Sequence, residues 1–262
     1  MSVPEGHMRG SSAVTTTLGL IGAGRIGSAL ARLAIAAGLE VVVSNSRGPE
    51  TLGELVASLG ERARAADVCD AAQAGHLVAV TVPLGSCTAL PVPELAGKIV
   101  IDTMNYYPER DGNIAQLDQQ ELTSSELVQR RLSGSRVVKA FNNIDFRRLE
   151  LLARPGISAE RSALPVAGDE DKARTEVREL LDVLGYDSVD VGNLAESWRF
   201  EPNTSVYVQP YLPDRPAGLS GVDDTMRWFL ECPGAVLAAD EVERLVRTTS
   251  RMSPATARER LD

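Results

Sequence analysis

The sequence predicts an α/β fold built on a doubly wound parallel sheet, with a small, mainly helical part at the C-terminal end. Three observations predict it. Short β-branched runs alternate with helical segments, a glycine cluster joins the first run to the first helix, and the alternation stops after Gly192. The expected strands are the apolar runs at residues 14–21, 40–44, 63–66, 77–82, 99–102, 136–141, 163–167 and 186–191.

Start and stop signals place the expected helices between these strands. Apolar residues recur at helical spacing over 26–37, and Gly38 ends that segment. Pro49 suits the first turn of a helix over 49–59. Residues 105–125 have no clear period, so we expect a long loop there, and long ordered loops often carry function. Further helical segments are expected at 70–74, 124–131, 170–184 and 239–247.

Composition and charge exclude several classes of protein. The 262 residues carry a net charge of −9, which opposes binding to nucleic acid. No apolar run reaches about 18 residues, so no membrane span is expected. The three cysteines stand at unrelated spacings and the two histidines lie far apart, which predicts no metal site. Reduced thiols fit a cytoplasmic protein.

The glycine cluster at residues 22–27 has the pattern GxGxxG and joins an apolar strand to a helix. Gly22 would allow the tight turn, Gly24 would let a diphosphate approach backbone N–H groups, and Gly27 would let the helix pack closely on the strand. The partial positive charge of the helix N-terminus would favour the phosphates. The pattern predicts a dinucleotide-binding Rossmann domain. The alternative is a glycine-rich turn without a ligand.

The end of the second strand distinguishes the two nicotinamide dinucleotides. NAD sites usually place an acidic residue there, to accept hydrogen bonds from the ribose hydroxyls. Here Asn45, Ser46 and Arg47 follow the strand, and the first carboxylate is Glu50. Arg47 can pair with a 2′-phosphate through a charge-assisted bond, which favours NADP(H). Arg47 could instead stack on adenine, and that contact would suit either cofactor.

We therefore expect three parts along the chain. Residues 1–14 form a tail outside the fold, residues 15–192 form the dinucleotide-binding Rossmann domain, and residues 193–262 form a small C-terminal domain with an extension. Gly6-His7-Met8 could be a cloning scar or native sequence.

Several motifs occur together in this chain. They are GLIGAGRIGSALA at the glycine loop, NSR after the second strand, TVP at 81–83, VVKAFNNI at 137–144, LPVAGDEDKA at 164–173 and GNLAESWRF at 192–200. In this combination, residues 16–210 resemble the NADPH-dependent reductases of the deazaflavin coenzyme F420, also called F420H2:NADP oxidoreductases. The resemblance implies an NADP(H)-dependent oxidoreductase with coenzyme F420 as a possible substrate. It also implies a homodimer.

The resemblance implies roles for particular residues. Ser46 and Arg47 would hold the 2′-phosphate, and Gly48 stands where the family often has a second basic residue. Asn142 stands where some members carry histidine, and with Ala140 and Ile144 it would border the ring of the second ligand. The full set of cofactor-binding residues expected is Gly22, Gly24, Arg25, Ile26, Asn45, Ser46, Arg47, Thr81, Val82, Pro83, Asn105, Ala140 and Asn142.

We predict no dedicated catalytic acid or base. His76 precedes a strand and fits a structural role better than a catalytic one. Lys139 could serve a ligand or extend to solvent, and Tyr106 and Tyr107 could donate protons or pack in their loop. Hydride transfer between two heteroaromatic rings depends mainly on proximity and orientation, so it suits a site without such residues.

Two other functions remain open from the sequence. One is reduction of a small imine or carbonyl, with Lys139 or a tyrosine as proton donor, and the other is a non-catalytic NADP(H)-binding sensor. A deazaflavin with an anionic tail would need a basic rim. The candidates for that rim are Arg130, Arg131, Arg147, Arg148 and Arg199, and the alternative for the paired arginines is a solvated helix face.

Overall fold

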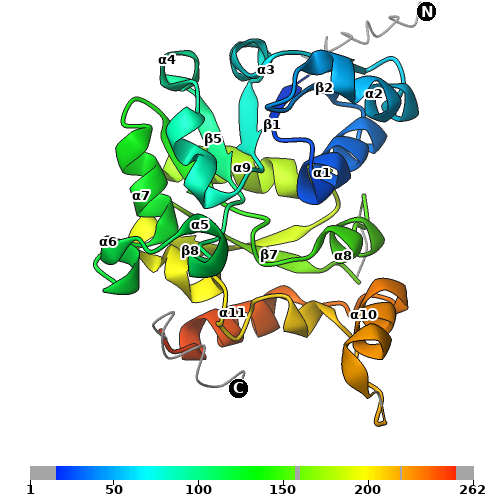
Figure 1. Cartoon of the computed structure of the whole chain (residues 1–262). Coiled ribbons are helices and arrows are strands. Elements are labelled where there is room, and N and C mark those ends of the chain that lie inside the picture. The colour runs from blue at the N-terminus through cyan, green and yellow to red at the C-terminus, as the bar shows by residue number, and fades with distance from the viewer. Residues whose placement is uncertain (1–15, 157–159, 219, 252–262) are drawn as a thin grey trace, which may run out of the picture.

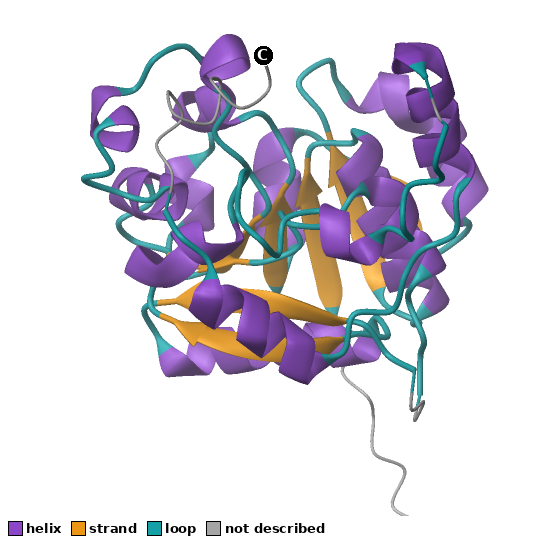
Figure 2. Cartoon of the chain, turned by 90° about the horizontal axis from the view of Figure 1, so that it is seen from below, coloured by secondary structure: helices purple, strands orange, loops and turns teal. Residues whose placement is uncertain are grey.

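One twisted sheet of eight strands runs through the computed structural model, which describes residues 16–156, 160–218 and 220–251. The strand order is β3-β2-β1-β4-β5-β6-β7-β8. Figure 2 shows the strands in the middle of the molecule with helices on both sides. The strands are β1 (Thr17–Ile21), β2 (Glu40–Ser44), β3 (Ala63–Ala65), β4 (Leu77–Val80), β5 (Ile99–Asp102), β6 (Arg136–Lys139), β7 (Ala163–Gly168) and β8 (Asp187–Gly192).

Helices alternate with the strands up to β8, and the described residues after it contain helices and loops only (Figure 1). The doubly wound α/β fold predicted from the sequence is therefore confirmed. The α-helices are α1 (Arg25–Ala36), α2 (Gly53–Leu59), α3 (Val68–Ala74), α4 (Val92–Leu95), α5 (Pro108–Asp111), α6 (Ala115–Asp118), α7 (Ser124–Arg131), α8 (Phe146–Leu151), α9 (Asp171–Val183), α10 (Gly221–Glu231) and α11 (Ala239–Thr248). The 3-10 helices are η1 (Pro49–Leu52), η2 (Leu84–Ala89), η3 (Leu194–Phe200) and η4 (Gln209–Tyr211).

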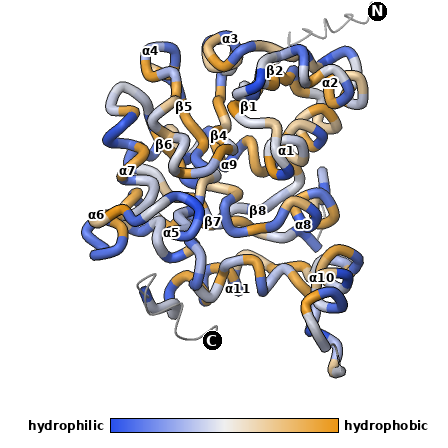
Figure 3. The backbone as a smooth tube through the Cα atoms, viewed as in Figure 1, coloured by the Kyte–Doolittle hydropathy of each residue, from blue (hydrophilic) through white to orange (hydrophobic). Residues whose placement is uncertain are grey.

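The register of the central strands places their carboxyl ends side by side. Ile21 pairs with Val80, Val80 with Asp102, and Asp102 with Lys139. Ligands of open α/β sheets bind outside this edge. The strand interiors are apolar and buried, and the tube coloured by hydropathy is mostly hydrophobic along the central strands (Figure 3). A rigid apolar centre thus supports the loops that leave the carboxyl edge.

The sheet departs from the fully parallel arrangement that the sequence predicts. β7 is antiparallel to β6, and β8 is parallel to β7. For β7 to run parallel to β6, the chain would first have to cross back to the end of the sheet where β6 begins. Instead, β7 meets β6 through its last residues, with Val138 opposite Gly168 and Lys139 opposite Ala167.

Side chains that follow β8 pack into the core of the sheet. Phe200, Tyr211 and Val242 are fully buried and belong to the same apolar cluster as the strands β1, β2 and β7. α11 packs on β7 and β8, and α10 lies beside it at the rim of the molecule (Figure 1). The boundary expected at residues 192–193 stays a prediction.

The structure differs from the expected elements at residues 105–125 and at helix α8. The stretch 105–125 is not a continuous loop, since it contains the short helices α5 and α6. The helix α8 was not expected. It begins where Asp145 Oδ1 accepts hydrogen bonds from the N–H groups of Arg147 (3.0 Å) and Arg148 (3.2 Å). The expected tail 1–14, the first residues of the expected strand 14–21 and the charged C-terminal end lie outside the described residues. No helix in the described ranges is long and apolar enough to span a bilayer.

Candidate active site

The glycine loop has a geometry in which each of its three glycines does a different task. Gly22 has φ +112°, and a Cβ there would lie 2.6 Å from Thr81 O, so a side chain is excluded. A Cβ at Gly27 would strike the backbone of Gly22, which explains the close packing of α1 on the loop. A Cβ at Gly24 would meet no atom within 4 Å, so the loop leaves open space there. Thr81 Oγ1 donates to Gly22 O at 2.7 Å and ties the loop to the end of β4.

The open space lies at the N-terminus of α1. Ser28 N–H donates to Gly24 O at 2.8 Å, so the N–H groups of residues 25–27 precede the first intrahelical bond of the helix. Such N–H groups, with the helix dipole behind them, bind phosphate. The residues present therefore fit the diphosphate of a dinucleotide.

The turn after β2 presents Ser46 and Arg47 to solvent. Asn45 shapes this turn, because its Oδ1 accepts from Arg47 N–H at 2.9 Å and its Nδ2 donates to Thr51 Oγ1 at 2.8 Å. Gly48 has φ +99°, a conformation that a larger side chain rarely adopts, which explains why no second basic residue stands there. The Glu50 carboxylate occupies the space that a side chain at Gly48 would fill.

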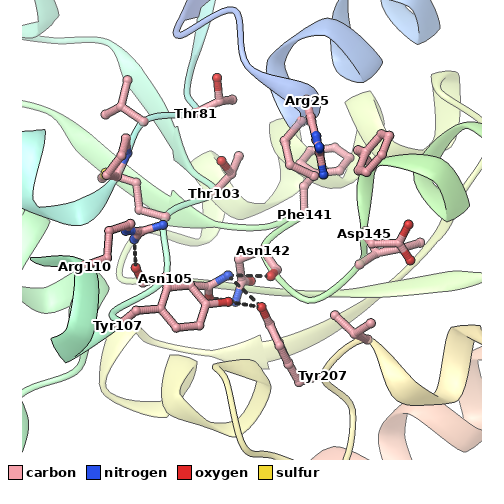
Figure 4. A pocket seen from close by; sticks show the side chains of 17 residues that line it. Arg25, Thr81, Thr103, Asn105, Tyr107, Arg110, Phe141, Asn142, Asp145 and Tyr207 are labelled. Carbon is pink, nitrogen blue, oxygen red and sulfur yellow. Dashed lines mark hydrogen bonds between the residues drawn. The ribbon is translucent and has the colours of Figure 1, made fainter. Parts of the chain in front are cut away.

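A cavity of about 510 Å³ opens at the carboxyl edge of the sheet, beside the glycine loop (Figure 4). One wall comes from the start of α1 and the end of β4, and the other comes from the loops after β5 and β6 and from the segment before η4. Seven of the residues expected from the sequence line it: Arg25, Ile26, Thr81, Val82, Pro83, Asn105 and Asn142. Ile144 also lines it, whereas Ala140 is fully buried in the core and is not among the lining residues.

A chain of hydrogen bonds crosses the wall opposite the glycine loop. Asn142 Nδ2 donates to Phe200 O at 2.8 Å and to Asn105 Oδ1 at 3.0 Å. Asn105 Nδ2 donates to Asn142 O at 2.8 Å and approaches the Tyr207 hydroxyl at 3.5 Å. The Tyr207 hydroxyl is in turn hydrogen-bonded to that of Tyr107. Figure 4 shows the hydroxyls of Tyr107 and Tyr207 pointing toward one another in the pocket.

Two residues of this wall have backbone conformations that side chains rarely adopt. Phe141 has φ +62° and Val208 has φ +56°. A positive φ is a pronounced outlier for a β-branched residue such as valine. Backbone strain of this kind costs about 1–3 kcal/mol per residue and concentrates at binding and catalytic sites.

Buried acceptor oxygens and flanking cations give the pocket its polarity. Asn142 Oδ1 and Asp145 Oδ2 are buried and have no hydrogen-bond partner among the described residues. Arg25 lies over the Phe146 ring at 5.1 Å, and Arg110 lies over the Tyr107 ring at 4.9 Å. A ligand that carries both N–H donors and negative charge would match these groups.

The loop that carries Tyr107 is fixed by a buried carboxylate. Asp111 accepts hydrogen bonds from the N–H groups of Tyr107 (3.0 Å) and Gly85 (3.1 Å) and from the Arg110 guanidinium. Burial alone would raise the pKa of Asp111, but these hydrogen bonds outweigh it and lower the pKa below its ordinary value. Tyr106 is a packing residue of the same loop, because its hydroxyl donates to Asp118 Oδ1 at 2.8 Å.

Lys139 neither lines the pocket nor reaches solvent. It is fully buried, and its Nζ donates to Met104 O and Ser124 Oγ, both at 2.9 Å. The carboxylates of Asp102 (3.5 Å) and Glu201 (3.6 Å) balance its charge. The interpretation of Lys139 as a side chain that extends to solvent is therefore wrong, because paired carboxylates make its full burial possible.

The five arginines that are candidates for a basic rim do not surround this pocket. None of them is among the lining residues. Arg148 is fully buried under the end of α10, where its guanidinium reaches the Phe229 and Cys232 carbonyl oxygens and the Asp145 carboxylate. The cations at the pocket are Arg25 and Arg110 instead.

Sequence reasoning missed several residues of the pocket. Tyr207 comes from the C-terminal part of the chain, a hundred positions after its partner Tyr107. Its neighbour Val208 and the residues Phe141 and Asp145 were also not expected to line it. A weak signal existed for Tyr207, since tyrosine is rare in a chain that is 4% aromatic. His76 lies outside the pocket, where it pairs with Glu176 at 3.3 Å.

A family model matches the first part of this fold. The family is described as NADP oxidoreductase, coenzyme F420-dependent, and its model matches residues 17–106, which include the glycine loop and the strands β1 to β5. A solved structure of a hypothetical protein from Sinorhizobium meliloti is 32% identical, with a TM-score of 0.66, and the match covers 76% of this chain and 96% of that one. The chain belongs to this family of NAD(P)-dependent oxidoreductases.

Two further relatives show how far the likeness extends. A structure from Arthrobacter sp. FB24, provisionally named an F420-dependent NADP reductase, is 24% identical with a TM-score of 0.59, over 70% of this chain and 87% of that one. That likeness shows the fold. The metalloreductase STEAP3 of Rattus norvegicus is 27% identical over 184 residues, which are 70% of this chain. The match covers 35% of that protein.

No candidate metal centre accompanies the likeness to a metalloreductase. Within residues 16–156, 160–218 and 220–251, no three or more His, Cys, Asp or Glu side chains are grouped so that they could hold a metal ion. The three cysteines are free, with Cys69 exposed and Cys87 and Cys232 buried.

Proposed function

We propose that the protein is an NADP(H)-dependent reductase that transfers hydride between the nicotinamide and a planar acceptor, with the deazaflavin coenzyme F420 as that acceptor. The observation that carries the proposal is the composition of the pocket walls. Four aromatic residues line one cavity in a chain that is 4% aromatic: Tyr107, Phe146 and Tyr207, which are partly exposed, and Phe141, whose side chain is almost fully buried. Aromatic walls favour a flat, conjugated ligand.

The choice of NADP(H) rests on the two loops that would hold it. The open space at Gly24 and the first N–H groups of α1 suit the diphosphate, and the exposed Ser46 and Arg47 suit a 2′-phosphate. When bound, NADPH supplies the hydride. Thr81, which is hydrogen-bonded to Gly22 of the glycine loop, and Pro83 both line the cavity, so the nicotinamide end would enter it there.

The protein's own contribution to the rate would be mainly positioning. The residues Phe141 and Val208, with their strained backbone, belong to the wall opposite the glycine loop. Bringing two reacting carbons close together in a fixed orientation can account for much of such a reaction's rate. Arg25 and Arg110 at the rim would attract the anionic parts of the acceptor.

A second acceptor class is favoured by a separate observation. The buried oxygens Asn142 Oδ1 and Asp145 Oδ2 have no partner among the described residues, and a buried unsatisfied acceptor costs about 1–3 kcal/mol. A substrate that carries an N–H group, such as a protonated imine, would satisfy them. A non-catalytic sensor of NADP(H) is the third possibility.

The deciding experiment mixes the purified protein with NADPH and coenzyme F420 and follows the loss of deazaflavin absorbance. We expect turnover with NADPH and much less with NADH. The Gly24→Val variant is the control for activity that does not depend on the glycine loop. If calorimetry shows tight NADPH binding but no deazaflavin is reduced, coenzyme F420 is not the acceptor. A panel of cyclic imines and ketones would then separate a small-molecule reductase from a sensor.

A further inference from the structure

We propose that Tyr107 and Tyr207 form a proton-donating pair, in which Tyr107 gives its hydroxyl proton to the acceptor and Tyr207 replaces it. This inference rests on the proposed function and adds a proton donor to a site that the sequence predicts to have none. The pair joins two distant parts of the chain, since Tyr107 follows β5 and Tyr207 precedes η4. Both residues line the cavity, and their hydroxyls are hydrogen-bonded to each other (Figure 4).

The amides behind the pair set the direction of its hydrogen bonds. Asn142 Nδ2 must donate to the Phe200 carbonyl oxygen, so the same nitrogen donates to Asn105 Oδ1. Asn105 therefore presents its Nδ2 to the Tyr207 hydroxyl oxygen, at 3.5 Å. With a donor behind it, the Tyr207 hydroxyl directs its single proton toward the Tyr107 oxygen. The proton of Tyr107 is then free to point at a bound ligand.

The protein holds Tyr207 in this place against local backbone strain. The next residue, Val208, has φ +56°, and its N–H donates to Asn143 O at 2.8 Å. Asn143 is itself fully buried, and its Nδ2 donates to Val206 O at 3.1 Å and to the Tyr211 hydroxyl at 3.0 Å. Strain that is maintained in this way points to a functional position.

The Tyr207 hydroxyl keeps its proton until it is passed on. Burial, with the neighbouring Tyr107 hydroxyl, raises the pKa of Tyr207 above its ordinary value, so this phenol stays protonated at neutral pH. The charged groups of the pocket that surround the pair are Arg110, which stacks on the Tyr107 ring, Asp145 and Arg25. The Arg110 guanidinium would stabilise negative charge that develops on the Tyr107 oxygen as its proton leaves.

The step balances as a two-electron reduction. The acceptor carbon forms a C–H bond with the hydride, whose electron pair leaves NADPH and oxidises it to NADP+. The Tyr107 O–H bond breaks, and its proton goes to the ring nitrogen or carbonyl oxygen that receives the displaced electron pair. The Tyr207 proton passes to the Tyr107 oxygen, and water restores the proton of Tyr207.

Tyr107→Phe tests the pair, and Tyr106→Phe is its matched control. The two tyrosines are neighbours on one loop, but the Tyr106 hydroxyl is occupied by Asp118 and packs the loop. We expect Tyr107→Phe to lower kcat for F420 reduction by about a hundredfold, the lower end of the usual contribution of a general acid. The Kd for NADPH, measured by calorimetry, should not change. Tyr207→Phe should lower kcat less, by about tenfold, since Tyr107 keeps its own proton.

Three outcomes separate this inference from the function on which it rests. No deazaflavin turnover by the unaltered protein would overturn the proposed function, and the pair with it. Turnover by the unaltered protein that Tyr107→Phe leaves within a factor of about two would overturn the pair alone, because a general acid contributes far more. Equal losses in Tyr106→Phe and Tyr107→Phe, with a raised KM in both, would show that the loop's packing matters and not the hydroxyl.

Discussion

The two halves of the pocket are built in different ways. The dinucleotide half consists of the glycine loop and the turn at residues 45–47, and each is a short continuous stretch at a strand-to-helix junction. The acceptor half brings together residues 105–110, 141–146 and 207–208, whose mutual hydrogen bonds join positions 37 to 102 apart in the chain. The dinucleotide half depends mainly on the local backbone conformation. The acceptor half depends on the tertiary contacts that bring its three segments together.

The two halves of the pocket are also stabilised by different interactions. Gly24, Ser46 and Arg47 of the dinucleotide half are exposed, and the shape of the glycine loop comes from Gly22 and Gly27, where a side chain would collide with the neighbouring backbone. The acceptor half rests on buried charge. Lys139 holds the start of the loop after β5 through Met104 O, and Arg148 packs behind Asp145. Substitutions in the first half should therefore change binding, and substitutions under the second should change stability.

Lys139→Met should have the largest effect. The variant leaves the carboxylates of Asp102 and Glu201 without their buried cation, which should lower the free energy of unfolding by about 3–5 kcal/mol. Chemical denaturation measures it, and Lys172→Met on the exposed surface of α9 is the control. If both variants lose a similarly small amount of unfolding free energy, the acceptor half does not depend on the ionic cluster of Lys139, Asp102 and Glu201.

Gly24→Val should remove dinucleotide binding while the protein stays folded. The backbone at Gly24 has φ −74°, which valine accepts, and the new side chain would fill the space that suits the diphosphate. We expect a loss of at least about a hundredfold in NADPH affinity, or about 2.7 kcal/mol. Gly53→Val makes the same change in another open position and should bind normally. Retained affinity in Gly24→Val would show that the dinucleotide does not lie along this loop.

Arg47→Ala should weaken the binding of NADPH and leave the binding of NADH unchanged. A hydrogen bond to a charged group contributes about 1.5–3 kcal/mol, so the Kd for NADPH should rise roughly ten- to a hundredfold. Arg64→Ala, an exposed arginine of β3, provides the comparison. If both cofactors lose affinity equally, Arg47 stacks on adenine and does not contact the 2′-phosphate.

Asp111→Asn should have the smallest effect and a characteristic pH dependence. Asparagine keeps one acceptor oxygen, so we expect a loss of about 1 kcal/mol in the free energy of unfolding, the difference between a charged and a neutral hydrogen bond. The pKa of Asp111 is lower in the folded protein than its ordinary 3.8. The carboxylate's contribution is thus complete above pH 3.8 and is lost as the pH falls through the lower folded pKa.

The check is denaturation of both proteins over a series of pH values. The difference between them should be constant near neutral pH and should shrink in acid, whereas Asp214→Asn at an exposed position should show little difference at any pH. A difference that persists unchanged below the folded pKa would mean that the charge of Asp111 does not hold the Tyr107 loop.

The sequence by itself determined the fold class and the dinucleotide half. Alternating apolar runs and helical segments act over a few residues, and the GxGxxG pattern specifies a backbone shape whatever surrounds it. The positions of Gly22, Gly24 and Gly27 and the exposed pair Ser46 and Arg47 could therefore be predicted without knowledge of the tertiary structure. Which of these residues contact the cofactor stays a prediction.

Only the tertiary structure decided the acceptor half. No local pattern brings Tyr207 to Tyr107, since their meeting depends on how the chain returns across the sheet after β8. Burial likewise reversed the expected place of Lys139 and Arg148, because a charged side chain is drawn into the interior only where partners from distant segments converge on it. The antiparallel β7 has the same origin. Its pairing with β6 was decided by the path of the chain and not by the composition of the strand.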